Sequence, residues 1–501
     1  MAEDTLKKRY IIKLTGNFIN GLINIALIAI VPKSLGPIAY GQFTFIQQFY
    51  TQTIAFLDAS TSIAFFTKLS AQSKRKELIL FYFVFSIFLL ILLSLFISIL
   101  DLTHSIDKVL PSIPTEYVYL GLFFGYLTWF TQVYIKISDA YALTVSIELG
   151  KIIHKVFMLL VLMFIIHYTL FDLFYYFYFH YFSLLSFLLF VTIIFIKKNI
   201  ITQKLLIIKL NYRELILEFY QYVSPLFIFN FIAIAVSLFD IWLLQHMSGS
   251  IQTGYYGLAY TVAAMCLLFT SAMTPLITRE FSKYSALNDK KAIKRLFKKY
   301  VPMLYSLASF FGVFIAFQSE NLLLIFTDDN FKDAYIVLMI MAFFPIHQTY
   351  GQLNGSLFFA MERTRRYSKI GIMISVSGLI LSFLFLFYYE FAAEGLAWKM
   401  IIMQIIGVNI QLYFNVKSLK LKLLPFIYHQ IYSIAFFVSI GYLANNIIPD
   451  ITSYSLGDFL FRGFIYTLLS VVGIFFFPSI FSSTQKELFA IIYSIKKRLK
   501  R

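Results

Sequence analysis

Long apolar segments alternate with short polar ones along the whole chain, and the apolar segments are too long for strands. Residues 78–100 read LILFYFVFSIFLLILLSLFISIL and contain no charged side chain. A bilayer core about 30 Å thick needs about 20 apolar residues per helix, whereas a transmembrane barrel shows alternating segments of about 10 residues. The pattern therefore predicts an all-α integral membrane protein with 14 transmembrane helices. We expect these spans near 12–32, 42–67, 78–100, 117–138, 152–170, 174–196, 222–246, 255–278, 301–319, 334–360, 370–389, 394–416, 425–446 and 458–482.

The composition excludes a soluble protein and offers no catalytic motif. The 501 residues are 60% hydrophobic and 13% charged, whereas a soluble domain carries about 25% charged residues. The single cysteine, Cys266, lies in an apolar segment, which excludes a disulfide framework and argues against a cysteine-ligated metal site. The chain contains neither a P-loop nor an H-E-x-x-H motif. We therefore expect no enzyme activity, no metal and no cofactor.

The basic residues predict the orientation in the membrane. With the N-terminus placed in the cytoplasm, only three of the 42 Lys and Arg residues fall in outer loops, namely Lys33, Lys108 and Lys332. Cytoplasmic loops are the ones enriched in Lys and Arg, so both termini are expected in the cytoplasm. The net charge of +17 belongs to loops that face anionic lipid. Membrane lipids are therefore the expected partners, and nucleic acid is not.

A glycine-containing segment between the first two spans recurs later in the chain. KSLGPIAYGQF at 33–43 and MSGSIQTGYYG at 247–257 both interrupt apolar sequence, which predicts a tight outer turn where positive φ or close approach is needed. Six spans separate the two copies, so both have the same orientation, as in parallel internal repeats. Three pairs of positions match at an offset of 213 residues: Gly36 with Gly249, Gly41 with Gly254, and Asn17 with Asn230.

The repeat predicts the domain organisation. We expect two parallel six-helix lobes around a central cleft, followed by two additional transmembrane helices and a basic tail. The corresponding ranges are 1–213 for the N-terminal lobe, 214–424 for the C-terminal lobe, 425–483 for the additional helices and 484–501 for the cytoplasmic tail.

Four segments carry a resemblance to a known family. LGPIAYGQF, SLFDIWLLQHMSGSIQTGYYGLAY, SAMTPLITREFSKY and QLNGSLFFAMERTRRYSKIG resemble the polysaccharide transporter family, which includes O-antigen and capsule repeat-unit flippases of the Wzx type. That family belongs to the superfamily shared with multidrug and toxin extruders. One departure is Ile241, because the family often has a basic residue after the aspartate matched by Asp240. A charge role for that neighbour is therefore not carried over.

The resemblance implies a substrate and a location. It implies translocation of an undecaprenyl-diphosphate-linked oligosaccharide from the cytoplasmic to the periplasmic leaflet of the bacterial inner membrane. A polysaccharide polymerase and a chain-length regulator are the further partners expected from it. Ion coupling is the expected driving force, because the chain contains no nucleotide-binding motif.

Polar side chains in three spans are candidates for substrate binding or coupling. Ionisable groups at bilayer depth cost about 2.5–3.5 kcal/mol on insertion scales, so they face a partner, water or the protein interior. The alternative for each is a hydrogen bond between packed helices. The candidates are Asp58, which follows Gln47 and Thr51 on one stripe; Asp240, which follows Asn230 and Ser237; and Asn17, Asn20 and Asn24 on one face of the first span.

Two basic residues lie inside spans, Lys399 in EGLAWKM and Arg462 in GDFLFRG. Both are near the outer side, so either one can extend its charge to the interface. A diphosphate carrier, which the resemblance implies, would instead require a fixed cation on its route. We therefore retain both as substrate-binding candidates.

The most polar stretch in any span is FFPIHQTYGQLNGS at 343–356. Pro345 and the glycines weaken the helix, and broken helices that line a cavity are a common way for transporters to place binding groups at depth. The alternative is a kink satisfied by neighbouring helices. The side chains that offer hydrogen bonds to sugar hydroxyls are His347, Gln348, Gln352 and Asn354.

Three functions are compatible with these patterns. The first is a flippase for a lipid-linked oligosaccharide. The second is a multidrug or toxin extruder of the same superfamily, and the two additional helices argue against it because extruders usually have twelve spans. The third is a membrane polysaccharide polymerase or ligase. Such enzymes need sizeable outer loops, and the longest outer loop of this chain, near 101–116, has no convergent acid–base cluster.

Overall fold

The computed structural model describes residues 6–485, except positions 60, 73, 142, 225–226, 268–269, 271–272, 328 and 448–455. Over these residues the chain is helical and contains no strand, as predicted. Among these described residues, twelve helices are long and apolar enough to cross a membrane. The basic tail lies almost entirely outside the described residues, so its conformation stays a prediction.

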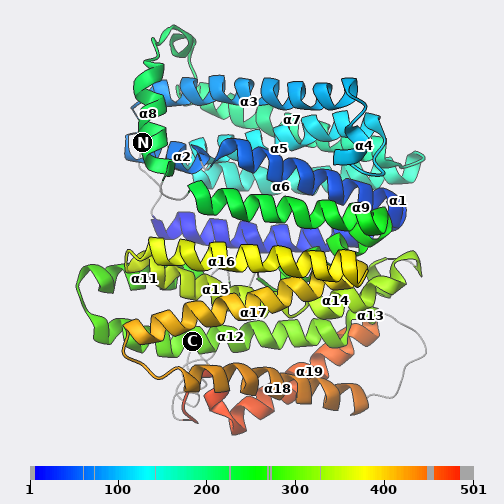
Figure 1. Cartoon of the computed structure of the whole chain (residues 1–501), viewed down its shortest axis with the longest axis vertical. Helices are drawn as coiled ribbons and strands as arrows, with labels where there is room; N and C mark the ends of the chain where they lie inside the picture. The colour runs from blue at the N-terminus through cyan, green and yellow to red at the C-terminus, as the bar shows by residue number, and fades with distance from the viewer. Residues whose placement is uncertain are drawn as a thin grey trace, which may run out of the picture. The chain divides into compact units, whose positions relative to one another are not determined.

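The chain divides into two compact units. Unit 1 runs to Gly254 and includes Leu386–Ala392, and unit 2 comprises Tyr255–Phe385 and the chain from Ala393 onward. Long helices lie side by side within each unit (Figure 1). The elements of unit 1 are α1 (Leu6–Asp58), α2 (Thr61–Ala71), α3 (Lys76–Leu102), α4 (Ile106–Val109), α5 (Thr115–Ala140), α6 (Thr144–Tyr168), α7 (Leu173–Lys197), η1 (Gln203–Ile207), α8 (Tyr212–Val223) and most of α9 (Phe227–Met265).

Unit 2 holds the end of α9 and the remaining helices. Within it, α12 packs against α15 and α18, α11 packs against α15, and α18 packs against α19. Its elements are α11 (Thr274–Ala286), α12 (Lys290–Phe317), α13 (Ser319–Phe326), η3 (Asp329–Ala334), α14 (Tyr335–Met341), α15 (Phe344–Ala360), α16 (Thr364–Ser382), η4 (Phe383–Tyr388), α17 (Ala392–Ser418), α18 (Leu424–Ile447), α19 (Leu456–Phe476) and η5 (Pro478–Phe481).

The two glycine-containing segments are sharp breaks at which two helical segments meet. Helical geometry is interrupted at Gly36 in α1 (φ 73°, ψ 169°) and at Gly249 in α9 (φ 75°, ψ −176°), so the positive φ predicted for these glycines is confirmed. This conformation favours glycine because it has no Cβ, and Pro37 then supplies the fixed φ of a first helical position. The segments on either side of each break correspond to separate predicted spans. Those of α1 match 12–32 and most of 42–67, which ends in α2, and those of α9 match most of 222–246 and the first part of 255–278. With α1 and α9 each counted as two segments, the 14 expected spans agree with the 12 span-length helices of the described residues.

The two breaks contact each other through positions that correspond in the repeat. A Cβ on Gly41 would lie 1.7 Å from the carbonyl oxygen of Ser250, and a Cβ on Gly254 would lie 2.7 Å from that of Pro37. Pro37 and Ser250 are also 213 residues apart. The contact is therefore reciprocal, as expected for two copies of one motif packed face to face, and it requires glycine at both positions.

The boundary of unit 1 lies after Gly254, later than the boundary after residue 213 that the repeat predicts. The first segment of α9 packs on unit 1, which explains the difference. The indole Nε1 of Trp242 donates to the carbonyl of Lys108 (3.2 Å), and Gln245 Nε2 donates to the carbonyl of Pro111 (3.1 Å). The division into two transport lobes stays a prediction.

An ion-pair network anchors the short helix α8 to the start of α3. The Arg75 guanidinium donates to both carboxylate oxygens of Glu218 (3.1 Å each), and Lys68 Nζ lies 2.8 Å from Glu218 Oε1. The hydrogen bonds from Arg75 lower the pKa of the Glu218 carboxyl, and those to Glu218 and Glu77 raise the pKa of Arg75. These side chains are partly exposed, so the network contributes modestly to stability.

Candidate functional site

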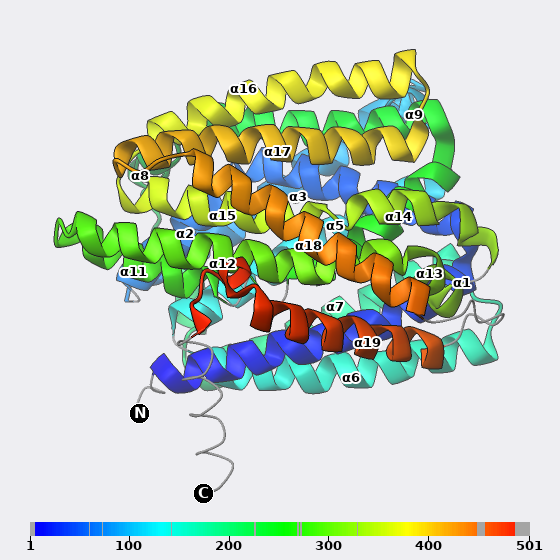
Figure 2. The ribbon, with the colours of Figure 1, turned by 90° about the horizontal axis from the view of Figure 1, so that it is seen from below.

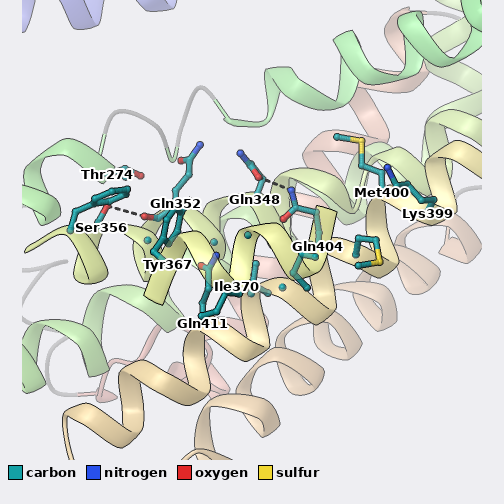
Figure 3. Close-up of a pocket in the computed structure, with 18 residues that line it drawn as sticks. Thr274, Gln348, Gln352, Ser356, Tyr367, Ile370, Lys399, Met400, Gln404 and Gln411 are labelled. Carbon is teal, nitrogen blue, oxygen red and sulfur yellow. Dashed lines mark hydrogen bonds between the residues drawn. The ribbon is translucent and has the colours of Figure 1, made fainter. Parts of the chain in front are cut away.

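A cavity of about 510 Å³ lies in unit 2 among α15, α16 and α17, and Thr274 of α11 also contributes to it. Its volume is in the range of small-molecule sites. Figure 3 shows side chains from these helices pointing into one space. Its polar lining residues are Thr274, Gln348, Gln352, Ser356, Tyr367, Lys399, Gln404 and Gln411.

Helical periodicity places the polar residues of α15 on one face. Gln348, Gln352 and Ser356 are spaced at i, i+4 and i+8, so their side chains project in nearly the same direction. The helix begins at Phe344, just before Pro345, shortly after the end of α14. Ala342 and Phe343 keep right-handed helical dihedrals, and α15 runs unbroken through Pro345, Gly351 and Gly355, so the broken helix predicted for this polar stretch is not found there.

Glycines bring the other two helices close to this face. A Cβ on Gly355 would lie 3.2 Å from the Tyr367 ring of α16, and one on Gly351 would lie 3.0 Å from Val408 of α17. Gly378 of α16 leaves room for the stem of Lys399, whose Cε would lie 3.1 Å from such a Cβ. The small residues thus let an aromatic ring and a lysine reach a cavity that larger residues would fill.

The amide groups of the cavity are partly satisfied. Gln404 Nε2 donates to Gln348 Oε1 (2.8 Å), and Ser356 Oγ donates to the carbonyl of Gln352 (2.8 Å), as Figure 3 shows. The buried Oε1 of Gln411 has no hydrogen-bond partner among the described residues. Buried polar atoms are normally paired, so this oxygen is suited to accept a donor from a bound molecule.

Lys399 gives the cavity its charge. Among the described side chains that line the cavity, Lys399 is the one with a charged group, and it is 7% exposed. A buried ammonium attracts an anion and disfavours a cation. Amide groups donate and accept hydrogen bonds, as sugar hydroxyls require. The arrangement therefore suits a polar, anionic molecule.

His347 and Asn354 lie on the other side of α15 and do not line this cavity. His347 is 4% exposed, and its ring lies 5.9 Å from that of Tyr305 of α12. Asn415 Nδ2 donates to Asn354 Oδ1 (2.9 Å), which joins α15 to α17. Of the sequence candidates in this stretch, the cavity brings together Gln348 and Gln352 with Lys399.

Asp58 lies in a hydrogen-bond network at the end of α1. Its carboxylate accepts hydrogen bonds from Tyr82 OH (2.7 Å), Ser62 Oγ (2.9 Å), Thr61 Oγ1 (3.0 Å) and the Ser62 backbone N–H (3.2 Å). Lys136 Nζ in turn donates to Ser62 Oγ (2.6 Å). Asp58 thus caps the start of α2, in the manner of N-terminal capping residues.

Arg462 is paired within the additional helices. Its Nε lies 2.9 Å from Asp458 Oδ2, one turn earlier on α19, and both side chains are nearly buried. Asn321 Nδ2 of α13 also donates to that carboxylate oxygen (3.2 Å). The charge of Arg462 is therefore balanced locally by Asp458.

The remaining candidates belong to the helices on either side of the glycine contact, and none lines the cavity. Asn20 of α1 is half-buried and its Oδ1 has no partner among the described residues, whereas Asn24 is exposed. Asn230 and Asp240 are half-buried in the first segment of α9. The side chain of Asn17 lies outside the described residues.

Sequence reasoning missed five of the polar lining residues, namely Thr274, Ser356, Tyr367, Gln404 and Gln411. A signal for two of them was present, because Gln404 and Gln411 are seven residues apart in one helix and therefore share a face. Tyr367 gave no such signal, since it reaches the cavity only through the packing of α16 on α15.

No protein-family model matches this sequence, and no curated protein matches it. Solved structures do match its fold. A lipid II flippase, MurJ, in an inward closed conformation has a TM-score of 0.65 at 15% identity over 93% of this chain and 98% of its own. An inward-facing multidrug resistance transporter of the MATE family has a TM-score of 0.61 at 14% identity, over 83% and 96%.

A MOP superfamily transporter from Pyrococcus furiosus has a TM-score of 0.57 at 15% identity, over 83% of this chain and 96% of its own. These identities are low, so the likeness concerns the arrangement of helices. The helix count and the span pattern agree with it. The chain therefore has the fold of the transporters of the MOP superfamily.

Proposed function

We propose that this protein is a flippase that moves an undecaprenyl-diphosphate-linked oligosaccharide, an O-antigen or capsule repeat unit, from the cytoplasmic to the periplasmic leaflet. The observation that carries this proposal is the cavity of unit 2, in which buried Lys399 lies beside a series of glutamines. The lysine offsets the diphosphate charge, the glutamines bind sugar hydroxyls, and Tyr367 offers a ring face to a sugar. A structural neighbour named as a lipid II flippase agrees with a lipid-linked substrate.

A multidrug extruder is the competing function within the same fold, because another neighbour is a multidrug resistance transporter. An extruder of organic cations would need a negative charge at its binding cavity. The charge in the cavity of unit 2 is positive. The polarity of the cavity therefore favours an anionic substrate.

The proposal includes ion coupling, and the structure of unit 1 bears on which aspartate takes part. Asp58 accepts four hydrogen bonds at the start of α2, an arrangement that also serves helix capping. Asp240 lies half-buried in the first segment of α9, nine residues before Gly249. We retain both as proposed coupling groups.

Substrate binding tests the proposal directly. We expect the full-length protein in nanodiscs to bind a polyprenyl-diphosphate oligosaccharide more tightly than the organic cation ethidium. Lys399→Met should weaken the first interaction about tenfold, because a hydrogen bond to a charged group contributes about 1.5–3 kcal/mol. Lys332→Met, in an exposed position outside the cavity, is the matched control. Preferential binding of ethidium would refute the proposal.

The proposed orientation predicts a labelling pattern. In a Cys266→Ser background, a cysteine at Ser105 should react with an impermeant thiol reagent added outside intact cells, and one at Asn288 should react only after permeabilisation. The reason is the concentration of basic residues on the side of Asn288. Labelling of the two positions in the reverse order would invert the proposed topology.

A further inference from the structure

A second concave site lies at the start of α12, separate from the cavity of unit 2 that Lys399 lines. It is a groove of about 490 Å³ lined by Lys291, Lys294, Arg295, Lys298, Lys299 and Ser482. The basic residues are spaced at i, i+3, i+4, i+7 and i+8, which places them along one side of the helix. Like charges at these spacings destabilise a helix, so α12 carries a local electrostatic cost that a bound anion would relieve.

The opposite wall of this basic groove is fixed by hydrogen bonds. The carbonyl oxygen of Ile480 fixes η5 to the neighbouring helices. It accepts a hydrogen bond from Ser306 Oγ of α12 (2.6 Å) and lies 2.8 Å from His429 Nε2 of α18. Ile480 is fully buried. Ser482 follows directly, so its position over the basic face of α12 is determined by the packing of η5.

The groove lies at the end of a membrane-spanning segment. The residues of α12 after Lys299 are largely apolar and buried, from Val301 to Ala316. Figure 2 shows α12 beside α18, with its N-terminal part extending away from the bundle of unit 2. Because the apolar segment marks the hydrocarbon region, the basic groove falls at the depth of lipid headgroups.

We propose that this groove docks the diphosphate group of a membrane lipid before that lipid reaches the cavity of unit 2. The basic residues of the groove lie along one helix face, and a diphosphate carries two adjacent anionic groups that can meet neighbouring cations on that face, whereas an ordinary phosphodiester carries one. A juxtamembrane Lys or Arg contributes about 1 kcal/mol to attraction of anionic lipid. The inference rests on the proposed function, since it assigns a first docking point to the same class of substrate.

Binding of geranylgeranyl diphosphate to the full-length protein in phosphatidylcholine nanodiscs tests this inference. We expect the diphosphate to bind at least about tenfold more tightly than geranylgeranyl monophosphate, inorganic pyrophosphate or phosphatidylglycerol. The double variant Lys294→Gln/Lys298→Gln should lose about tenfold in affinity, and the affinity should fall steeply with salt. The matched control Arg363→Gln/Arg365→Gln removes the same charge from the start of α16 and should change the affinity less than about twofold.

Three outcomes would overturn the inference. Equal loss in the control variant would indicate general attraction to basic loops. Equal affinity for phosphatidylglycerol would identify a site for ordinary anionic lipid, and equal affinity for pyrophosphate would identify a site for a soluble anion. Lys399→Met leaves the groove intact, so this variant should still bind geranylgeranyl diphosphate at the groove. In the wild-type protein, groove binding without oligosaccharide transport would count against the proposed function and not against the groove.

Discussion

Replacing Gly41 by alanine is expected to destabilise the protein strongly, although it adds only one methyl group. The new Cβ would lie 1.7 Å from the carbonyl oxygen of Ser250, and the clashing atom belongs to the backbone. Overpacking of a core costs about 1–3 kcal/mol, occasionally more, and this contact allows little relaxation because α1 and α9 must both move. The melting temperature and the folded yield of the purified chain measure the effect.

The matched control for this prediction is Gly407→Ala in α17, where a Cβ would meet Ile374 at an ordinary 3.5 Å. This variant should keep its stability, since alanine also favours helix more than glycine does. Gly254→Ala should behave like Gly41→Ala, because its Cβ would lie 2.7 Å from the carbonyl oxygen of Pro37. Wild-type stability of both Gly41→Ala and Gly254→Ala would mean that the reciprocal contact does not exist.

Replacing Lys399 by alanine is expected to abolish most transport of a diphosphate-linked oligosaccharide. The lysine supplies the charge of the cavity and is almost fully buried, so its loss leaves an anion without a counter-charge in a region of low dielectric. The expected loss is at least about tenfold, on the scale of one charge-assisted hydrogen bond. Surface polysaccharide in a complemented deletion strain, normalised to membrane-inserted protein, is the measurement.

Lys399→Arg should restore part of this activity, because arginine keeps the charge but changes the geometry of the donors. Gly378 already contacts the lysine stem, so the larger guanidinium fits less well and rescue stays incomplete. Normal surface polysaccharide in Lys399→Ala would show that this lysine has no part in handling the substrate.

Much of the fold follows from the pattern of the sequence. Apolar length alone placed the predicted spans on helices, because the bilayer requires each span to satisfy its own backbone. The offset between Gly36 and Gly249 marked two positions that share one backbone conformation. The sequence did not show that the two breaks pack against each other, since the contacts of Gly41 with Ser250 and of Gly254 with Pro37 depend on tertiary packing.

The residues of the candidate site could be predicted from the sequence where they share a face of a single helix. Gln348 and Gln352 share a face by spacing alone, and Lys399 is conspicuous in an apolar span. The partners of other candidates come from helices distant in sequence. Tyr82 reaches Asp58 from α3, and Asn415 reaches Asn354 from α17. Such pairs depend on tertiary packing, which periodicity within a single helix does not reveal.

Translocation by the purified protein is the most direct test of the central claim, that this fold moves an anionic lipid-linked oligosaccharide through the cavity of unit 2. Proteoliposomes would carry a fluorescent undecaprenyl-diphosphate oligosaccharide, and a quencher outside would report its movement between leaflets. The account predicts protein-dependent flipping that Lys399→Ala reduces and that excess ethidium leaves unchanged. Protein-dependent export of ethidium, with no flipping of the oligosaccharide lipid, would contradict it.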